Sequence, residues 1–214
     1  MNKKVNISII IPVYNEQDSL KDLCEEIKKN INSNYNWELI FINDGSNDNS
    51  KQIILELIEE NKNIRLIDFY RNHGKSEALN TGFKMSKGEI IITLDADLQD
   101  DPKEINRFIS KIKEGYGLVS GWKKNRLDPI SKRLPSKIFN FILRFISKIK
   151  IHDFNCGFKA YTRSAIKGIS IYGGLHRFMP VIIKNNGFTI SEIIVNHRER
   201  KYGGSKYNSS RISH

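Results

Sequence analysis

Cysteine is scarce in this sequence of 214 residues, which holds Cys24 and Cys156 and no other thiol. Two cysteines are too few for a disulfide framework, and neither belongs to a CxxC pair. A disulfide-rich secreted scaffold and a structural zinc site are therefore both excluded. Wholesale disorder is excluded as well, because 39% hydrophobic and 28% charged residues are ordinary values for a folded domain.

Long hydrophobic runs are also missing. A membrane-spanning helix needs roughly 20 consecutive, predominantly apolar residues. The segment that comes nearest, 138–149, is interrupted by Asn140, Arg144 and Lys148. We therefore expect no part of this chain to cross a bilayer by itself.

Acidic residues are rare in the C-terminal part of the chain. Residues 1–120 contain 16 Lys and Arg against 20 Asp and Glu, whereas residues 121–214 contain 19 against 4. The net charge of +11 therefore arises wholly from the last 94 residues, which alone carry +15. Such a segment indicates an anionic partner (nucleic acid, an anionic membrane surface or a phosphorylated substrate) unless it is only a well-solvated basic surface.

Short apolar runs alternate with helical patterns along the chain. Strand-like runs are found at 7–13, 38–43, 64–69, 89–95, 117–122, 158–161 and 189–195. Between the first five, apolar residues recur at helical spacing, as at Leu20, Leu23 and Ile27. This alternation predicts an α/β fold, a mostly parallel central sheet flanked by helices. The length suits a single domain, 1–214, whose composition changes near residue 121.

Polar segments follow three of the predicted strands. They are PVYNE at 12–16, NDGS at 43–46 and DADLQDDP at 95–102. Because ligands of a parallel sheet bind outside the carboxyl ends of its strands, we expect all three segments at one rim. Each alone is also typical of a turn or a helix cap, so it is their convergence that favours a binding site.

Asp95 and Asp97 form the most informative pair. Residues i and i+2 at a strand end project to the same side, so both carboxylates can face one point. Like charges held together need a compensating cation, and oxygen ligands suit Mg²⁺ or Mn²⁺. Such an ion commonly takes one or two carboxylates plus substrate phosphates, and Gln99 can add a further contact. The pattern predicts a site for a metal and a diphosphate.

These segments, together with RNHGKSEALNTG at 71–82, resemble in order and spacing the inverting family 2 glycosyltransferases of GT-A fold. More narrowly, the chain is similar to the polyisoprenyl-phosphate glycosyltransferases, the group that includes dolichol-phosphate mannose synthase and the undecaprenyl-phosphate sugar transferases. The downstream motifs DFNCGFKAY, HRFMP and HRERKYGGSKY strengthen this narrower match. The resemblance runs from about residue 5 to residue 207. One departure is Asn43, where another common form of the motif has Asp.

The resemblance implies inverting transfer of a sugar from a UDP- or GDP-sugar donor to a polyprenyl-phosphate acceptor at the cytoplasmic face of the membrane. The implied nucleotide-sugar ligands are Pro12, Tyr14, Glu16, Asp44, Gly74, Asp95 and Ala96. Asp95, Asp97 and Gln99 would bind the Mg²⁺ or Mn²⁺ that bridges the diphosphate.

The basic part of the chain gains a role from the same resemblance. Arg133 and Ser136 would bind the acceptor phosphate, and Arg200, Ser205 and Lys206 would close over the diphosphate. Arginine can bind phosphate through two parallel hydrogen bonds, while lysine acts as a point charge. The alternative interpretation of residues 200–206 is a frayed basic tail.

Asp153 lies just before Cys156-Gly157-Phe158 and is one of only four acidic residues after residue 120. We expect it to act as the catalytic base or to orient the acceptor. A phosphate monoester has its second pKa near 6, so the acceptor is already largely anionic at neutral pH and little base strength is needed. A structural role, capping this loop, is the alternative.

The segment 137–150 combines a wide apolar face with a polar side that carries lysine and arginine. This pattern predicts an amphipathic helix. It is typical of a helix that lies in a membrane interface near anionic headgroups. A core helix or a dimer-interface helix would show the same pattern.

Two other functions fit part of the sequence. The first is a glycosyltransferase that acts on a soluble or cell-surface glycan, which would explain the donor motifs. The second is a non-catalytic nucleotide-sugar or membrane-binding module. The presence of Asp95, Asp97 and Arg200 argues against this second function, because such a module would not need them. Nucleic acid is not an expected partner, because no recognised binding motif accompanies the charge. Relatives often continue into transmembrane helices or recruit membrane subunits, so a membrane-spanning partner subunit is an open expectation. No set of residues identifies the donor sugar.

Overall fold

All seven predicted strands are present in the structure, a computed structural model that describes residues 5–124 and 130–202. They are β1 (Ile7–Val13), β2 (Trp37–Asn43), β3 (Ile64–Asp68), β4 (Ile90–Thr93), β5 (Leu118–Trp122), β6 (Lys159–Thr162) and β7 (Ile190–Ile194). Each lies within two residues of its expected bounds. The apolar runs therefore located the strands correctly.

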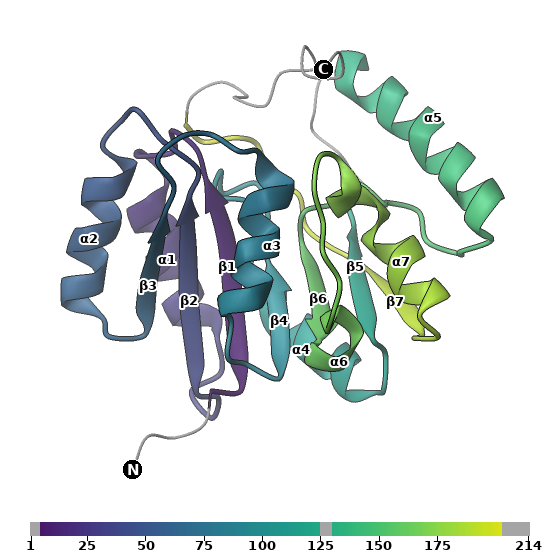
Figure 1. The fold of residues 1–214 in the computed structure, drawn as a ribbon, viewed down its shortest axis with the longest axis horizontal. Helices are drawn as coiled ribbons and strands as arrows, with labels where there is room; N and C mark the ends of the chain where they lie inside the picture. The colour runs from purple at the N-terminus through teal and green to yellow at the C-terminus, as the bar shows by residue number, and fades with distance from the viewer. Residues whose placement is uncertain (1–4, 125–129, 203–214) are drawn as a thin grey trace.

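The strands form one sheet in the order β3-β2-β1-β4-β6-β5-β7. β3, β2, β1 and β4 run parallel, and β5 pairs with β7 in parallel. β6 lies between β4 and β5 and is antiparallel to both. The sheet is thus mostly parallel, as predicted, and strands from the acidic and the basic part of the chain share it (Figure 1).

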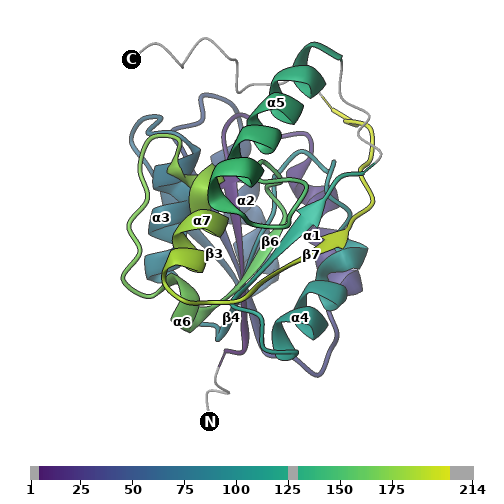
Figure 2. The ribbon, with the colours of Figure 1, turned by 90° about the vertical axis from the view of Figure 1, so that its right-hand side faces the viewer.

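Helices cover both faces of this sheet (Figures 1 and 2). They are α1 (Leu20–Asn30), α2 (Ser50–Glu60), α3 (Lys75–Met85), α4 (Ile105–Lys113), α5 (Ile130–Ser147), α6 (Arg163–Ile166) and α7 (Met179–Asn185), with 3₁₀ turns η1 (Pro102–Glu104) and η2 (Leu175–Phe178). Apolar residues of α1, α2 and α4 pack in one core cluster, and those of α3, α6 and α7 pack in another.

The central strand β1 shows why its sequence is apolar at nearly every position. Ile9 and Ile11 point into the cluster with α1, whereas Ile10 points into the cluster with α3. All three are fully buried. A strand covered on both faces does not alternate between apolar and polar residues, so its sequence is a nearly continuous apolar run.

Helix α5 stands apart from the two main layers (Figure 1). It begins at Ile130, seven residues before the predicted amphipathic segment, because Ile130 and Leu134 are isolated apolar residues and the following Pro135 is unfavourable inside a helix. One edge of the helix packs through Phe139 and Leu143 against Ile151 and Phe154. The other apolar side chains that the structure describes in this helix are exposed to solvent: Ile138, Phe141, Ile142, Phe145 and Ile146. In the described ranges, no helix is long and apolar enough to span a bilayer.

A glycine fixes the turn that follows β2. Gly45 has φ +68°, and a Cβ built on it would lie 2.6 Å from the backbone nitrogen of Asn72. This close approach brings the NDGS segment against residues 71–72. Gly168 has a similar φ of +77°, but no atom lies within 4 Å of its hypothetical Cβ.

We predict that Gly45→Ala lowers the free energy of unfolding by about 2–4 kcal/mol, because a left-handed backbone cost and a backbone clash add up. Gly168→Ala is the matched control and should lose only about 1 kcal/mol, since it carries the backbone cost alone. Urea unfolding followed by circular dichroism measures both. Equal losses in the two variants would contradict the close approach at Gly45.

Candidate functional site

The first two polar segments interlock at the carboxyl ends of β1 and β2. The backbone nitrogen of Asn15 donates to Ser46 Oγ over 2.9 Å, and Asn47 N donates to Asn15 Oδ1 over 2.7 Å. Glu16 N donates to Ser50 Oγ over 3.0 Å at the start of α2. Side chains of one segment therefore satisfy the backbone of the other, as the predicted common rim requires.

Asp44 links the NDGS segment to the loop that precedes α3. Its side chain is fully buried. The carboxylate accepts hydrogen bonds from His73 N at 2.6 Å, Gly74 N at 2.9 Å and Asn72 Nδ2 at 2.9 Å. These bonds fix the 72–74 loop against the NDGS segment, while the role of Asp44 in holding the nucleotide stays a prediction.

The other residues assigned to the nucleotide sugar lie around this rim. Pro12 is in β1 and is buried, while Tyr14 is half-buried just beyond the strand. Gly74 has φ +93° and stands at the N-cap of α3, a conformation that favours glycine. Ala96 is buried between the two aspartates.

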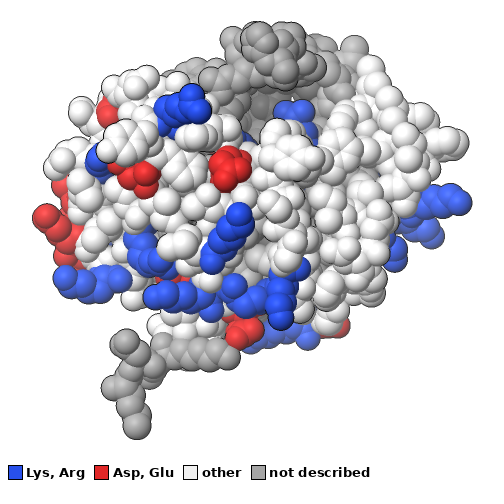
Figure 3. Space-filling view, in the orientation of Figure 1, with Lys and Arg blue, Asp and Glu red and all other residues white. Residues whose placement is uncertain are grey.

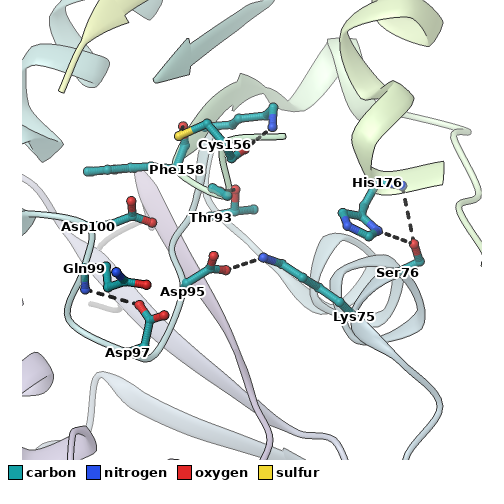
Figure 4. Close-up of polar contacts among 12 residues, drawn as sticks. Lys75, Ser76, Thr93, Asp95, Asp97, Gln99, Asp100, Cys156, Phe158 and His176 are labelled. Atoms are coloured by element: carbon teal, nitrogen blue, oxygen red, sulfur yellow. Dashed lines mark hydrogen bonds and ion pairs between the residues drawn. The ribbon is translucent and has the colours of Figure 1, made fainter. Parts of the chain in front are cut away.

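Asp95 forms an ion pair with Lys75, the first residue of α3 (Figure 4). Lys75 projects from the helix start towards the carboxylate, which follows the end of β4. Burial alone would raise the pKa of Asp95. The ammonium groups of Lys75 and Lys123 outweigh burial and hold that pKa well below its usual value.

Asp97 meets a different cation. Arg200 Nη2 lies 3.1 Å from Asp97 Oδ2 and 2.9 Å from Glu16 Oε1, so one guanidinium joins the first motif, the third motif and the C-terminal motif. All three side chains are largely buried. Burial and the nearby charges of Asp95 and Asp100 raise the pKa of Asp97 in spite of Arg200.

Gln99 is turned towards the C-terminal segment. Its Nε2 donates to the carbonyl of Arg198 over 3.4 Å, and Arg198 N donates to the carbonyl of Gln99 over 2.9 Å. The Arg198 guanidinium in turn binds Glu26 on α1 and Asp101 at the start of η1. These contacts hold residues 196–200 across the DADLQDD segment and set Arg200 opposite Asp97.

The donor set fits a hard divalent cation only together with a ligand. Two carboxylates lie close together here, since the charge of Asp95 raises the pKa of Asp97, and oxygen ligands are what Mg²⁺ and Mn²⁺ prefer. Within residues 5–124 and 130–202, no cluster of three or more His, Cys, Asp or Glu side chains is placed to hold a metal by itself. The remaining ligands would have to be phosphate oxygens and water.

Asp153 is buried in the loop before β6. Its Oδ1 accepts a hydrogen bond from Asn155 N at 3.1 Å, a contact that caps the loop. Glu192 on β7 accepts from the backbone nitrogens of His152 at 2.7 Å and Asp153 at 3.0 Å. The capping alternative is thus visible in the structure, while a catalytic role for Asp153 stays a prediction.

The same loop reaches the metal-site carboxylates. A Cβ on Gly157 would lie 2.6 Å from Asp95 Oδ2, so only glycine leaves room for this carboxylate. Thr93 Oγ1 donates to the carbonyl of Gly157 over 2.7 Å, and the buried Lys159 ammonium donates to the carbonyls of Phe154 and Cys156. The DFNCGF motif therefore shapes one wall of the site.

Of the residues assigned to the acceptor phosphate, the structure describes one side chain. Ser136 lies in α5, and its Oγ accepts a hydrogen bond from Asn155 Nδ2 over 3.1 Å, which connects α5 to the Asp153 loop. The Arg133 side chain, Ser205 and Lys206 lie outside the described part of the chain.

Several site residues were missed by sequence reasoning. Lys75, Arg198 and Glu192 pair with residues far away in the sequence, and spacing within a motif carries no signal for such partners. Sequence reasoning also missed Lys123, whose buried ammonium group forms an ion pair with Asp100 at 2.7 Å. Within residues 5–124 and 130–202, neither carboxylate oxygen of Asp100 has a well-aligned hydrogen-bond donor, so the attraction between the two charges holds this pair. For Arg198, the alternation of Arg198 and Arg200 on an extended segment was the available signal.

Ser76 and His176 form a further pair beside Lys75 (Figure 4). Ser76 Oγ lies 2.7 Å from His176 Nδ1, and His176 N donates to the same Oγ over 3.3 Å. Burial lowers the pKa of His176 to about 3, and the charges of Lys75 and Arg177 add to this effect. The imidazole is therefore neutral at physiological pH.

The sequence profile described as Glycosyl transferase family 2 matches residues 8–170. An undecaprenyl-phosphate 4-deoxy-4-formamido-L-arabinose transferase of Pseudomonas fluorescens is 35% identical over 216 residues, covering 96% of this chain and 61% of that protein. A dodecaprenyl-phosphate galacturonate synthase of Rhizobium johnstonii is 33% identical over 215 residues, covering 98% of this chain and 64% of that protein. This chain spans less than two thirds of the length of either relative.

Among solved structures, the glucosyl-3-phosphoglycerate synthase from Mycobacterium tuberculosis in complex with Mn²⁺, UDP and glucosyl-3-phosphoglycerate has a TM-score of 0.74. The match covers 94% of this chain and 73% of that chain, at 17% identity. At this identity the likeness concerns the fold. The prediction of an α/β fold of GT-A type is confirmed.

The opposite pKa shifts of Asp95 and Asp97 generate a prediction for metal-free protein at pH 7. Asp95→Asn should lower the melting temperature, because the folded state favours the ionised Asp95, and Asp97→Asn should raise it, because the folded state disfavours the ionised Asp97. For Asp95 the effect is at most about 2 kcal/mol, since its pKa is lowered to about 2; for Asp97 the opposite sign is the expected result. Differential scanning calorimetry in EDTA measures both.

The two effects should also differ in their pH dependence. The stability that Asp95 contributes is complete above the ordinary aspartate pKa of about 4 and is lost as the pH falls below it. The destabilisation by Asp97 disappears as the pH falls through its raised pKa. Melting temperatures that shift in the same direction for both variants at pH 7 would contradict the assignment.

Proposed function

Because this chain belongs to glycosyl transferase family 2, we propose that it transfers a sugar from a nucleoside diphosphate sugar to the phosphate of a polyprenyl phosphate. The observation that carries the proposal is the meeting of Asp95, Asp97 and Arg200 at one rim of the sheet. This rim offers both carboxylates for a cation and a guanidinium for a diphosphate. The names of the two curated relatives support a polyprenyl phosphate as the acceptor.

The order of the strands supports a linear arrangement of the donor. Tyr14 and Glu16 follow β1 and Asp44 follows β2, so the nucleoside would lie over these two strands. The next strand is β4, which leads to Asp95 and Asp97, and the diphosphate would lie there. Beyond β4 comes β6 with the Asp153–Gly157 loop. The sugar and the acceptor would meet on that side.

Asp95 and Asp97, with Gln99 beside them, are the residues that would hold Mg²⁺ or Mn²⁺. Such an ion would neutralise charge on the leaving diphosphate. The solved neighbour with Mn²⁺ and UDP supports this donor chemistry. Lys75 and Arg200 now balance the two carboxylates, and with a metal in place they would be free to bind phosphate oxygens instead.

The proposed transfer is a single displacement with inversion. An oxygen of the acceptor phosphate attacks the anomeric carbon of the sugar, and the bond from that carbon to the β-phosphate oxygen breaks. The nucleoside diphosphate leaves with the electron pair. The acceptor already carries negative charge at neutral pH, so the task of the protein is to hold two anions together and to orient them. Arg133 and Ser136 would bind the acceptor phosphate, and Asp153 would orient it.

Helix α5 supports an acceptor that is presented at a lipid surface. Its exposed apolar residues include Phe141, 69% exposed, and Phe145, 79% exposed. The surface over α5 is largely uncharged in the space-filling view, with basic side chains at its edge (Figure 3). Ser136, on the same helix, would bring the acceptor phosphate towards the Asp153 loop. We therefore propose that α5 lies in the interface of an anionic membrane on its cytoplasmic side.

The decisive assay supplies Mg²⁺ or Mn²⁺, a panel of UDP- and GDP-sugars and a short polyprenyl phosphate. We expect release of UDP or GDP only when the lipid phosphate is present. Asp97→Ala should reduce this release by about 100-fold or more, because it removes a metal ligand. Coupled detection of the released nucleotide measures the rate.

Other outcomes of this assay point elsewhere. Release of UDP or GDP only with glycan acceptors would show that the acceptor is a glycan and not a lipid phosphate. No release with any donor and acceptor would indicate a non-catalytic binding module.

Membrane binding by α5 can be tested separately by flotation with vesicles of phosphatidylcholine and phosphatidylglycerol. Phe141→Ser with Phe145→Ser should abolish flotation, since burying each phenylalanine contributes about 1.5–3 kcal/mol. The matched control is Leu55→Ser, which changes an exposed apolar residue on α2, away from α5 (Figure 1). Both proteins should keep the wild-type melting temperature. Unchanged flotation of the double variant would refute the interfacial position of α5.

A further inference from the structure

The HRFMP motif has no part in the proposed function so far. Its first residue, His176, lies in η2, which packs against α3. The charges that act on His176 come from Lys75 at the start of α3, the adjacent Arg177 in η2, Lys159 at the start of β6 and Asp95 after β4. In the close-up, His176 lies on the Lys75 side of the Lys75–Asp95 ion pair (Figure 4).

The hydrogen bonds of Ser76 bear on which nitrogen of His176 carries the proton. Ser76 Oγ accepts the backbone N–H of His176, and its own hydrogen can be donated to His176 Nδ1 at 2.7 Å. We assign Nδ1 as the acceptor of this bond, which places the hydrogen of the neutral ring on Nε2. Among the described residues, no hydrogen bond to Nε2 is present, so this donor is available to a ligand.

The position of this donor relative to Asp95 identifies the part of the ligand that it would meet. In Figure 4, Asp97 lies on one side of Asp95, whereas Lys75 and His176 lie on the other. Glu16 and Arg200, at the nucleoside end, belong to the Asp97 side. A donor whose diphosphate is held at Asp95 and Asp97 would therefore extend its sugar towards His176.

The charge state of the ring favours a hydroxyl over a phosphate. Lys75 provides a full positive charge beside Asp95 and suits a phosphate oxygen. The imidazole is uncharged and offers a single N–H, which matches the oxygen of a sugar hydroxyl. Lys75 would then bind the β-phosphate, and His176 would bind the sugar.

We propose that His176 Nε2 donates a hydrogen bond to a hydroxyl of the donor sugar and that Ser76 positions the ring for this contact. The inference rests on the proposed function, since it requires a nucleotide sugar in the site. It makes His176 a specificity-determining residue for the sugar, without a role in binding the nucleotide.

The test compares two substitutions that separate the two ring nitrogens. His176→Asn keeps an amide group near the position of Nδ1 and removes the Nε2 donor, whereas His176→Gln places an amide nitrogen near the position of Nε2. Isothermal titration calorimetry with Mn²⁺ measures the affinities for UDP and GDP, and for whichever of UDP-glucose, UDP-galacturonate and GDP-mannose the wild type binds.

We expect His176→Asn to weaken binding of the sugar nucleotide by about 3- to 10-fold, the effect of one hydrogen bond, and to leave the affinity for the bare nucleotide unchanged. His176→Gln should recover most of the loss. Ser76→Ala keeps the ring but not its anchor, so it should weaken sugar-nucleotide binding in the same selective way. It also provides the test if His176→Asn lowers the melting temperature.

Two results would overturn the inference: an equal loss for the bare nucleotide and the sugar nucleotide, or no loss in either His176→Asn or Ser76→Ala. A wild-type protein that binds none of these nucleotides or nucleotide sugars would instead refute the proposed function itself. The two failures are therefore distinguishable in one set of titrations.

Discussion

The repulsion between two carboxylates at the end of β4 governs the arrangement of this site. Asp95 and Asp97 face the same rim, and neither is fully open to water. The fold balances them with cations from remote segments, Lys75 from the start of α3 and Arg200 from the C-terminal segment. The balance is unequal, since the pKa of Asp95 is lowered and that of Asp97 is raised. Because the ionised form of Asp97 is disfavoured even with Arg200 beside it, the site is prepared for a stronger cation.

Other contacts serve to hold those cations and loops in place. The carboxylate of Asp44 accepts hydrogen bonds from the loop before α3 and thereby sets the position of Lys75. Arg198 binds Glu26 and Asp101, which sets the position of Arg200. The charged side chains of Asp44 and Arg198 thus serve mainly to hold neighbouring segments of the protein in place. Polar groups this well connected hold their neighbours rigidly, and a rigid rim suits the positioning of two anionic substrates.

The strands and the place of the site could be predicted because their signals are local. Continuous apolar runs marked every strand, and the strand-end rule placed 12–16, 43–46 and 95–102 at one rim. The partners could not be predicted, because Lys75 and Asp95 are 20 residues apart and Arg200 and Asp97 are 103 residues apart. The assignment of Asp44 shows the same limit: a carboxylate after a strand can face a ligand or a neighbouring loop, and the sequence does not distinguish these. The start of α5 was missed because its first turns hold only two isolated apolar residues and Pro135, which usually indicates a helix boundary.

The antiparallel strand β6 has a consequence for the order in which the protein is assembled during synthesis. β5 leaves the ribosome before β6, yet its sheet partners are β6 and β7, which follow later in the chain. Until residue 162 has been made, β4 and β5 face each other across a missing strand, with their backbone edges unpaired. The strands β1 to β4 can pair as they emerge, but β5 can join this sheet only after β6 has been inserted between β4 and β5. The nascent chain therefore carries an open, aggregation-prone sheet edge beside the loop that bears Asp95 and Asp97.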